Sequence, residues 1–520
     1  MAEPAKKQLS SSKNSSSQST LNQIKGRISN ELVIALCGAV GSGVRPLKHQ
    51  LKKELEKNGY QVIDIRISSL ITQEIKRSSD STVESIKPIS GVSRIKELQN
   101  QGNQLRKQHG NDYLAKLAIR DISSNRTSIV STTAFTDPTN SDVLENKTLK
   151  KVAYLVDQLK HPSEVSLFKA VYPKNFYLIS LIRTEKERRL NLEEKNFDQA
   201  SIDDVIRTDR KQDQKHGQQV EKTVYLGDYF IRNMHSHAEN LNKEIIRFLQ
   251  LVHGVQGISP RKDEKGMSAA YTASLQSACL SRQVGAAIAD ESGVVVSTGR
   301  NDVPEFGGGL YSFESGQNDY RCIHKGKKCY NDLYKENLRL EIEKVLQDRG
   351  VSTAFDLSKN VLSETKVGAL IEYSRAIHAE MDAITTLARK DNASTAGKIL
   401  YCTTYPCHNC ARHIVASGIK RVIYIEPYEK SLAIKLHDDS ISDSNEQFKV
   451  SFEPYEGVSP RRYMAFFGMV NRRKDDEGRA LDVDIEKAVH IDPQYLDNYH
   501  AYEDKIVENL IENNLSPQTA

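Results

Sequence analysis

One histidine and two cysteines constrain the fold of this chain more than any other feature. His378 is followed in the same region by Cys407 and Cys410, which sit in the run Pro-Cys-His-Asn-Cys. Imidazole and thiolate are zinc ligands, and three protein ligands leave the fourth position of a tetrahedral Zn²⁺ free for water. The fold must therefore bring these three side chains to one point.

The residues around the three ligands predict how they are held. Residues 398–404 alternate and are rich in β-formers, which predicts a strand, and residues 411–417 with Gly418 as a stop predict a helix. Both sulfurs would lie on the first turn of that helix, where unpaired N–H groups favour thiolate. His378 begins a second helical run. Glu380, two residues later, is near enough to reach a zinc-bound water while remaining a poor fourth ligand.

This order of residues resembles the H-x-E…P-C-x-x-C signature of the zinc nucleobase deaminases. In that signature the zinc lowers the pKa of a water, and the glutamate, here Glu380, moves its protons. A lone Cys-x-x-Cys is also typical of a redox pair or of half a structural zinc knuckle. The His-x-Glu and Cys-x-x-Cys pairs together, in this order, favour the catalytic interpretation.

The segments that precede His378 resemble one family within this group. Residues 277–288 and 293–304 are similar to the S-x-C…VGAVI…STGYNxxP segment of the deoxycytidylate deaminase family. The resemblance implies that Asn301 contacts the deoxyribose and that the segment around Tyr405 frames the base. Arg282 is a candidate phosphate partner because a guanidinium matches phosphate oxygens. The alternatives are a turn-forming role for Asn301 and a solvent-exposed position for Arg282.

The chain departs from that family in an insertion at about 305–375. Cys322, His324 and Cys329 lie in it and are candidates for a second, structural zinc with a ligand from elsewhere, such as Cys279. A structural zinc needs four protein ligands, and the fourth is not clear here. The favoured interpretation is therefore that these cysteines are reduced thiols.

A second motif stands near the start of the chain. The apolar run 32–37 predicts a buried strand, and a glycine-rich loop and a helix from about Pro46 follow it. Strand, glycine loop and helix in this order cradle phosphates with backbone N–H groups and the helix dipole. The predicted nucleotide-binding residues are Gly38, Gly41, Ser42 and Gly43.

This loop is degenerate as a P-loop. Lysine and then serine or threonine should follow the last glycine, for phosphate charge and Mg²⁺ respectively, but Val44 and Arg45 stand there. The expected strand at 128–131 also does not end in an obvious aspartate. We therefore expect nucleotide binding without phosphoryl transfer.

The rest of the N-terminal region resembles the dephospho-coenzyme A kinase and deoxynucleotide kinase type. Residues 160–168 precede an expected strand at 176–182, and residues 183–190 resemble the arginine-bearing lid of those kinases. Residues 227–233 and the amphipathic helix to Leu251 resemble their last strand and helix. A charged, exposed helix face is the alternative for the arginines of the lid.

Composition and charge exclude several classes. The chain of 520 residues has seven cysteines and a net charge of +5, and residues 1–30 alone contribute +4 (five basic residues against one acidic). The remainder is about neutral, which disfavours a polynucleotide binder and favours free nucleotides. An odd cysteine count suits a reducing compartment, and no apolar run approaches membrane-spanning length. We expect a cytoplasmic protein that binds neither DNA nor membranes.

The sequence thus predicts an α/β protein with an N-terminal P-loop kinase-like parallel-sheet domain. A C-terminal cytidine-deaminase-like α/β/α domain with a mixed five-stranded sheet should follow. The expected boundaries are a disordered basic and serine-rich tail at 1–30, the nucleotide-binding domain at 31–253, a linker at 254–266, the zinc-dependent domain at 267–500 and a C-terminal helix or tail at 501–520.

A degenerate P-loop domain fused to such a deaminase resembles the bacterial anti-phage dCTP deaminases. The resemblance implies one catalytic Zn²⁺ per chain, conversion of dCTP and dCMP to dUTP and dUMP, depletion of the dCTP pool during infection, a regulatory nucleotide on the N-terminal domain and a homo-oligomer. Two alternatives stay open: a housekeeping dCMP deaminase for thymidylate synthesis, and a nucleotide-sensing regulator with an inactive deaminase.

Overall fold

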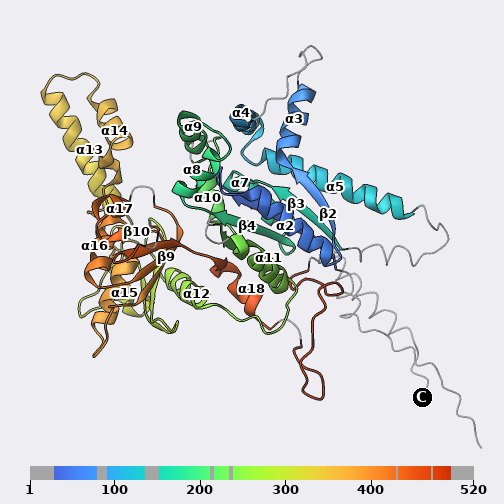
Figure 1. The fold of residues 1–520 in the computed structure, drawn as a ribbon. Helices are drawn as coiled ribbons and strands as arrows, with labels where there is room; N and C mark the ends of the chain where they lie inside the picture. The colour runs from blue at the N-terminus through green and yellow to red at the C-terminus, as the bar shows by residue number, and fades with distance from the viewer. Residues whose placement is uncertain are drawn as a thin grey trace, which may run out of the picture.

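The computed structural model describes residues 28–78, 91–134, 151–210, 216–233, 238–428, 431–444, 446–469 and 472–493. It has two six-stranded sheets, each with helices on both faces (Figure 1). The tail expected at 1–30, except for its last three residues, and the segment expected at 501–520 lie outside the described residues.

The first sheet has the strand order β12-β5-β4-β1-β3-β2. Its strands are β1 (Glu31–Gly38), β2 (Gln61–Arg66), β3 (Val152–Asp157), β4 (Phe176–Ile182), β5 (Tyr229–Arg232) and β12 (Gly457–Val458). Strands β1 to β5 are parallel, whereas β12 is antiparallel to β5. Strand β1 is a continuous apolar run with both faces buried, as parallel strands covered by helices require.

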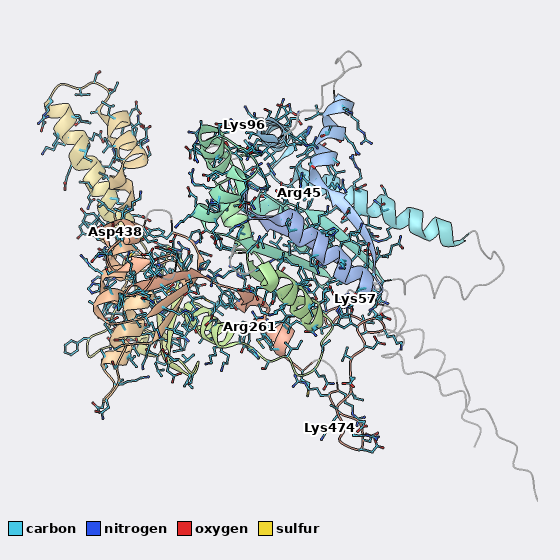
Figure 2. The ribbon with its side chains drawn as sticks, viewed as in Figure 1. Arg45, Lys57, Lys96, Arg261, Asp438 and Lys474 are labelled. Carbon is cyan, nitrogen blue, oxygen red and sulfur yellow. The ribbon has the colours of Figure 1, made fainter. Side chains whose placement is uncertain are left out.

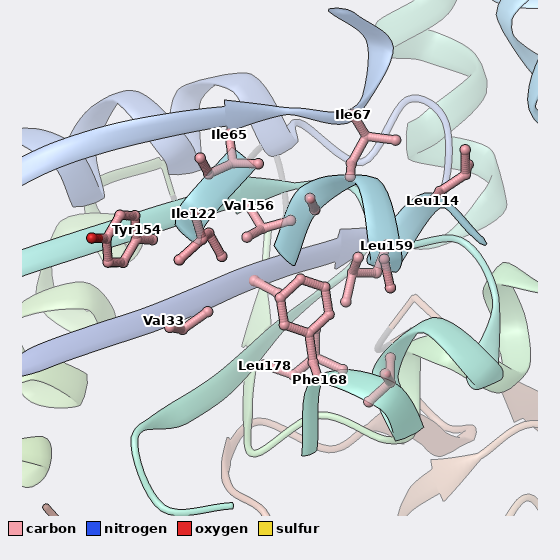
Figure 3. Close-up of a cluster of buried hydrophobic side chains, with 14 of the residues drawn as sticks. Val33, Ile65, Ile67, Leu114, Ile122, Tyr154, Val156, Leu159, Phe168 and Leu178 are labelled. Atoms are coloured by element: carbon pink, nitrogen blue, oxygen red, sulfur yellow. The ribbon is translucent and has the colours of Figure 1, made fainter. Parts of the chain in front are cut away.

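Helices cover both faces of this sheet and divide its core in two. The helices are α2 (Val44–Lys57), α3 (Ile67–Ser78), α4 (Gly91–His109), α5 (Tyr113–Ala134), α7 (Pro162–Val171), α8 (Glu185–Glu193), α9 (Gln199–Arg210), α10 (Val220–Val224) and α11 (Ala238–Val252). On one face α2 and α11 pack their leucines, isoleucine and phenylalanine against the strands. On the other, α5 and α7 pack Ile122 and Phe168 against Val33 and Val156 (Figure 3).

The second sheet has the strand order β10-β11-β9-β8-β6-β7. Its strands are β6 (Gly285–Ala289), β7 (Val295–Arg300), β8 (Ile399–Thr404), β9 (Arg421–Glu426), β10 (Ile441–Ser442) and β11 (Val450–Pro454). Strand β6 is antiparallel to both its neighbours, and the other pairs are parallel, so the sheet is mixed.

Helices again cover both faces of this second sheet. They are α12 (Lys262–Ser274) on one face and α15 (Ala379–Ala388) and α16 (His408–Ala416) on the other, with the short α17 (Ala433–Leu436) beside α16. The insertion forms η3 (Phe313–Asn318), α13 (Tyr330–Asp348), α14 (Ala354–Glu364) and η4 (Lys366–Ala369). Helices α13 and α14 pack mainly on each other and project from the domain as a hairpin (Figure 1).

The two halves of the chain share a core and a strand. Phe230 of β5 packs in one buried cluster with Met267 of α12 and Ile423 of β9. Strand β12 follows directly after the second sheet but extends the first, and η5 (Pro460–Arg462) and α18 (Tyr463–Phe467) follow it, with Phe466 in the first domain's core. The sheets are therefore linked through β5.

Several expectations need correction. The second sheet has six strands rather than five because the two-residue β10 adds an edge, and the first sheet gains an antiparallel strand. Residues 128–131 lie in helix α5. One of the two strands beside β1 is β3, which does end in an aspartate, Asp157. Part of the expected linker, from Lys262, is helix α12, and β12 of the expected second domain belongs to the first sheet.

Candidate active site

The structure brings His378, Cys407 and Cys410 together. The Nδ1 atom of His378 lies 3.4 Å from the sulfur of Cys407 and 3.3 Å from that of Cys410. Among the described residues these three form the only group of histidine, cysteine or acidic side chains placed to hold a metal ion.

Two helix N-termini place the three side chains. His378 is the residue before α15, and Cys407 is the residue before α16, where its sulfur accepts a hydrogen bond from the backbone N–H of Cys410 at 3.4 Å. Helix α15 lies close on β7 at Gly299. A Cβ there would come within 2.3 Å of the carbonyl oxygen of Ala379, so only glycine admits this approach.

The spacing of the three ligand atoms fits Zn²⁺. With Zn–S of about 2.3 Å and Zn–N of about 2.0 Å, ligands at tetrahedral angles lie about 3.5 Å apart. The observed 3.3 and 3.4 Å agree with that separation, and the imidazole–dithiolate donor set is one that zinc prefers.

The electrostatics of the cluster favour ligation. Hydrogen bonds from the Cys410 thiol and from His378 lower the pKa of Cys407 to about 4, so this sulfur is a thiolate at neutral pH. The Cys407 contact raises the pKa of His378 to about 9, whereas the thiolate neighbour and burial raise the pKa of Cys410. A cation in place of the shared protons would satisfy all three groups.

Glu380 lies on the first turn of α15, and its side chain is buried with 4% exposure. Burial raises the pKa of Glu380, and the Cys410 thiol and the charge of His378 act against that rise. A buried carboxyl group with an elevated pKa, next to a candidate metal site, is suited to accepting and donating a proton.

A cavity of about 170 Å³ opens beside the cluster. Its lining residues come from several elements: Cys279, Ser281, Arg282, Val284, Asn301, Asn331, Ile371, Ser374, Ala376, His378, Ala379, Glu380, Thr404, Tyr405, Cys407 and Tyr428. The three candidate metal ligands, the acid/base candidate and a binding space thus share one site.

The three predicted substrate-binding residues all line this cavity, each already held by the protein. The side chain of Asn301 accepts from the N–H of Val284 at 2.7 Å and donates to the carbonyl oxygen of Arg282 at 2.8 Å. Arg282 donates to Thr404 and forms an ion pair with Glu426 at the exposed edge.

Tyr405, the third of these residues, packs edge-on against two aromatic rings of the second sheet, with its ring centroid 4.8 Å from that of Tyr424 and 5.4 Å from that of Phe452. It forms an aromatic wall of the cavity.

The insertion cysteines are not gathered into a second metal site among the described residues. His324 pairs with Asp319 at 3.3 Å, and the sulfur of Cys329 lies 3.4 Å from the hydroxyl of Ser281. None of the seven cysteines forms a disulfide.

The glycine loop of the first domain lies between β1 and α2. Gly41 and Gly43 have positive φ values of 85° and 91°, which explains the glycines, and Ser42 between them is buried at 1% exposure. A Cβ at Gly38 would meet the Ser42 hydroxyl at 2.5 Å.

Basic side chains gather around this loop from other elements. Arg183 donates to the carbonyl oxygen of Gly41 at 3.4 Å. Burial and the neighbouring charges of Arg45 and Arg183 lower the pKa of Lys195, so these three cations share one region. Arg45 stands at the N-terminal end of α2, opposite Lys57 at its other end (Figure 2).

Sequence reasoning missed two residues of the candidate active site. Asn331 reaches the cavity from α13, and Glu426 holds Arg282 from the end of β9. Neither lies in a motif. The one signal that could have suggested Glu426 is the β-rich run Arg-Val-Ile-Tyr-Ile-Glu, which the structure shows as strand β9.

No helix of the described part of the chain has the length and apolarity needed to span a membrane.

The second domain is similar to proteins of known family. The family model of the cytidine and deoxycytidylate deaminase zinc-binding region matches residues 260–426. The deoxycytidylate deaminase of Enterobacteria phage T2 is 34% identical over 164 residues, which cover 31% of this chain and 78% of that protein. The enzyme of the same name from Enterobacteria phage T4 is 33% identical over 164 residues, covering 31% and 76% respectively.

A solved structure, the dCMP deaminase of cyanophage S-TIM5 in complex with dCMP and dUMP, matches at 20% identity with a TM-score of 0.23. The match covers 38% of this chain and 100% of that one, and at this similarity it adds nothing to the sequence matches. From the family match and the identity to the phage enzymes, the chain belongs to the deoxycytidylate deaminase family.

Proposed function

We propose that this protein is a zinc-dependent hydrolase that deaminates free deoxycytidine nucleotides, converting dCMP and dCTP to dUMP and dUTP. The observation that carries the proposal is the His378–Cys407–Cys410 cluster, with Glu380 buried in the same cavity. Family membership supports the reaction, and the phage relatives are deoxycytidylate deaminases by name.

The residues divide the chemistry between them. His378, Cys407 and Cys410 would hold Zn²⁺, which when bound lowers the pKa of a coordinated water so that it attacks carbon at neutral pH. Glu380 accepts the proton of the attacking water and returns it to the leaving amino group. Because its pKa is raised by burial, the carboxyl group can take up that proton before it gives it away.

The cavity walls support a cytosine nucleotide as substrate. Tyr405 supplies an aromatic face for the base, and two polar residues also line the cavity, the buried Asn301 and the exposed Arg282. The Arg282 guanidinium forms an ion pair with the Glu426 carboxylate. A substrate phosphate would therefore compete with that carboxylate for Arg282.

The direct test is incubation of the zinc-loaded protein with cytosine nucleosides, their mono- to triphosphates and a single-stranded oligonucleotide, followed by product mass analysis. We expect a gain of one mass unit, the change from amino to carbonyl, for dCMP and dCTP. Conversion of the oligonucleotide without conversion of free nucleotides would refute the proposal.

We further propose that the N-terminal domain binds a regulatory nucleotide without transferring phosphate. The loop keeps glycines and nearby cations, but Val44 packs in the core where a P-loop lysine would stand. Asp157 at the end of β3 accepts from Lys48 at 3.2 Å and from the N–H of Ile67 at 2.9 Å. Both of its oxygens are thus engaged within the protein rather than left for Mg²⁺.

Two consecutive residues at the end of β5 support coupling between this loop and the second sheet. The amide of Asn233 donates to the carbonyl oxygen of Ser42 at 2.8 Å. Arg232 donates to Glu453 of β11 at 3.1 Å, and the same carboxylate accepts from Arg421 of β9 at 2.9 Å.

Strand β9 ends in Glu426, the partner of Arg282 at the cavity. A nucleotide that binds one arrangement of the loop better than another would bias the cavity through these contacts. The check is dCMP deamination with and without ATP, GTP or dTTP, none of which is a cytosine substrate. Unchanged rates with every nucleotide, or labelled phosphate transfer to a deoxynucleotide, would contradict this part.

We extend the proposal to anti-phage defence, because fusion of a degenerate P-loop domain to a deaminase resembles the defence enzymes. Cells carrying the gene should lose dCTP after infection, and cells carrying the Glu380→Ala variant should keep it. A dCTP pool that is unchanged in both would leave the housekeeping role as the better account.

A further inference from the structure

One wall of the active-site cavity comes from the insertion. Asn331 lies on the first turn of α13, and its side chain lines the cavity that also contains His378 and Glu380. Its Oδ1 atom is buried and has no hydrogen-bond partner among the described residues. An acceptor left unpaired at a buried position costs free energy, so a ligand that donates to it would gain that energy.

The position of Asn331 along the cavity follows from its neighbours. Glu380 and Cys407 form the floor, each with 4% exposure, whereas Ser281 and Arg282 are exposed and mark the mouth. Cys329, which immediately precedes α13, lies 3.4 Å from the Ser281 hydroxyl. Asn331 therefore enters the cavity from the mouth side.

A substrate nucleotide has its base at the floor, since Glu380 must reach the amino group there. Its sugar and phosphate then lie toward the mouth, beside Asn331. A 5′-phosphorylated deoxyribose has a single hydroxyl donor, on C3′. The Asn301 amide is already bonded to the backbone of Val284 and Arg282, whereas Asn331 Oδ1 has no hydrogen-bond partner in the part of the chain that the structure describes.

We infer that Asn331 reads the sugar by accepting a hydrogen bond from the 3′-hydroxyl of the deoxycytidine nucleotide. The inference rests on the proposed function and names a specificity residue within it. An amide suits this position because it supplies an acceptor without placing a negative charge near the substrate phosphate.

The test removes each partner of the hydrogen bond in turn. Wild type and Asn331→Leu are assayed with dCMP and with its 2′,3′-dideoxy analogue, which lacks the hydroxyl. Asn331→Leu should raise KM for dCMP roughly 3- to 10-fold with little change in kcat. For wild type, KM for the analogue should exceed KM for dCMP by a similar factor. For Asn331→Leu, the KM values for dCMP and the analogue should be the same.

The same cycle can be measured without turnover. Calorimetric binding of dUMP and of its dideoxy analogue to zinc-loaded Glu380→Ala protein, with and without Asn331→Leu, should show the same non-additivity. This separates the two claims. If wild type fails to deaminate dCMP, the proposed function fails; if the two losses add in the binding cycle, the assignment of Asn331 fails.

Two further variants exclude general effects. Asn337→Leu changes an exposed asparagine of the same helix and should leave both KM values unchanged. Asn331→Asp keeps an acceptor and suits a helix first turn, so the protein should fold and still distinguish dCMP from its analogue. An Asp variant that binds both equally would overturn the assignment.

Discussion

A partly buried carboxyl group between the two sheets gives this protein a pH-dependent stability that one substitution should remove. Glu456 lies between β11 and β12, and its side chain accepts from Asn240 of α11 at 3.3 Å. Burial, together with the charge of Glu244, raises the pKa of Glu456 to about 7, against the partial compensation of Arg232 and Arg261.

The sign and size of the effect follow from linkage. The unfolded chain releases this proton near its ordinary value of 4.5, whereas the folded protein holds it up to about pH 7. Between these values the folded state binds more protons, so its stability falls as the pH rises. At 1.36 kcal/mol for each pH unit, the loss between about pH 5 and about pH 8 is about 2.5 kcal/mol.

The glutamine side chain of Glu456→Gln stays neutral, so this variant should not lose folding stability from this position as the pH rises. Its free energy of unfolding relative to wild type should rise by about 2.5 kcal/mol between about pH 5 and about pH 8. Urea unfolding followed by tyrosine fluorescence measures this, since the chain has 22 tyrosines and no tryptophan. Glu341→Gln, at an exposed position of α13, is the matched control. A stability difference that does not change with pH would refute the assigned burial of Glu456.

Three other substitutions test the architecture. Gly299→Ala places a Cβ 2.3 Å from the carbonyl oxygen of Ala379, so α15 must shift; we expect about 1–3 kcal/mol of destabilisation by thermal unfolding and a loss of kcat. Asn233→Ala removes the contact with Ser42 and should abolish any effect of ATP or GTP on deamination while leaving the basal rate near that of wild type; a retained response would exclude this route. Cys410→Ser should lower zinc content measured by atomic absorption, and full zinc occupancy would contradict its role as a ligand.

The His378–Cys407–Cys410 cluster could be predicted because its geometry is mostly local. Cys407 and Cys410 lie one helical turn apart, and a strand and a glycine on either side fix that turn. The strand at 399–404 and the helices at 379–388 and 408–416 appear as expected from periodicity. Likewise, the glycine loop follows from the positive φ angles that only its glycines adopt readily.

The predictions that were wrong or missing concern features that depend on contacts between distant parts of the chain. Residues 128–131 resemble a strand in composition, yet they continue a long helix that begins at Tyr113. Strands β10 and β12 have two residues each, too few for any periodic signal, and are fixed by their neighbours in the sheets. The contact of Asn331 with the cavity arises from the packing of an insertion, which has no signature in the sequence.

A substitution at Gly43 is a second way to perturb the glycine loop. A Cβ at Gly43 would lie 2.4 Å from the amide nitrogen of Asn233, and the φ angle there is 91°. Gly43→Asp would therefore distort the loop itself as well as repel a phosphate, so Asn233→Ala is the cleaner perturbation.

The proposed reaction is hydrolysis at a zinc held by His378, Cys407 and Cys410, with Glu380 moving protons. Its decisive test is to measure zinc content and ammonia release from dCMP on wild type and on Glu380→Ala. We expect one bound zinc per chain at this cluster in both proteins, with ammonia release lost in the variant by several orders of magnitude. Ammonia release at the wild-type rate from Glu380→Ala would contradict it.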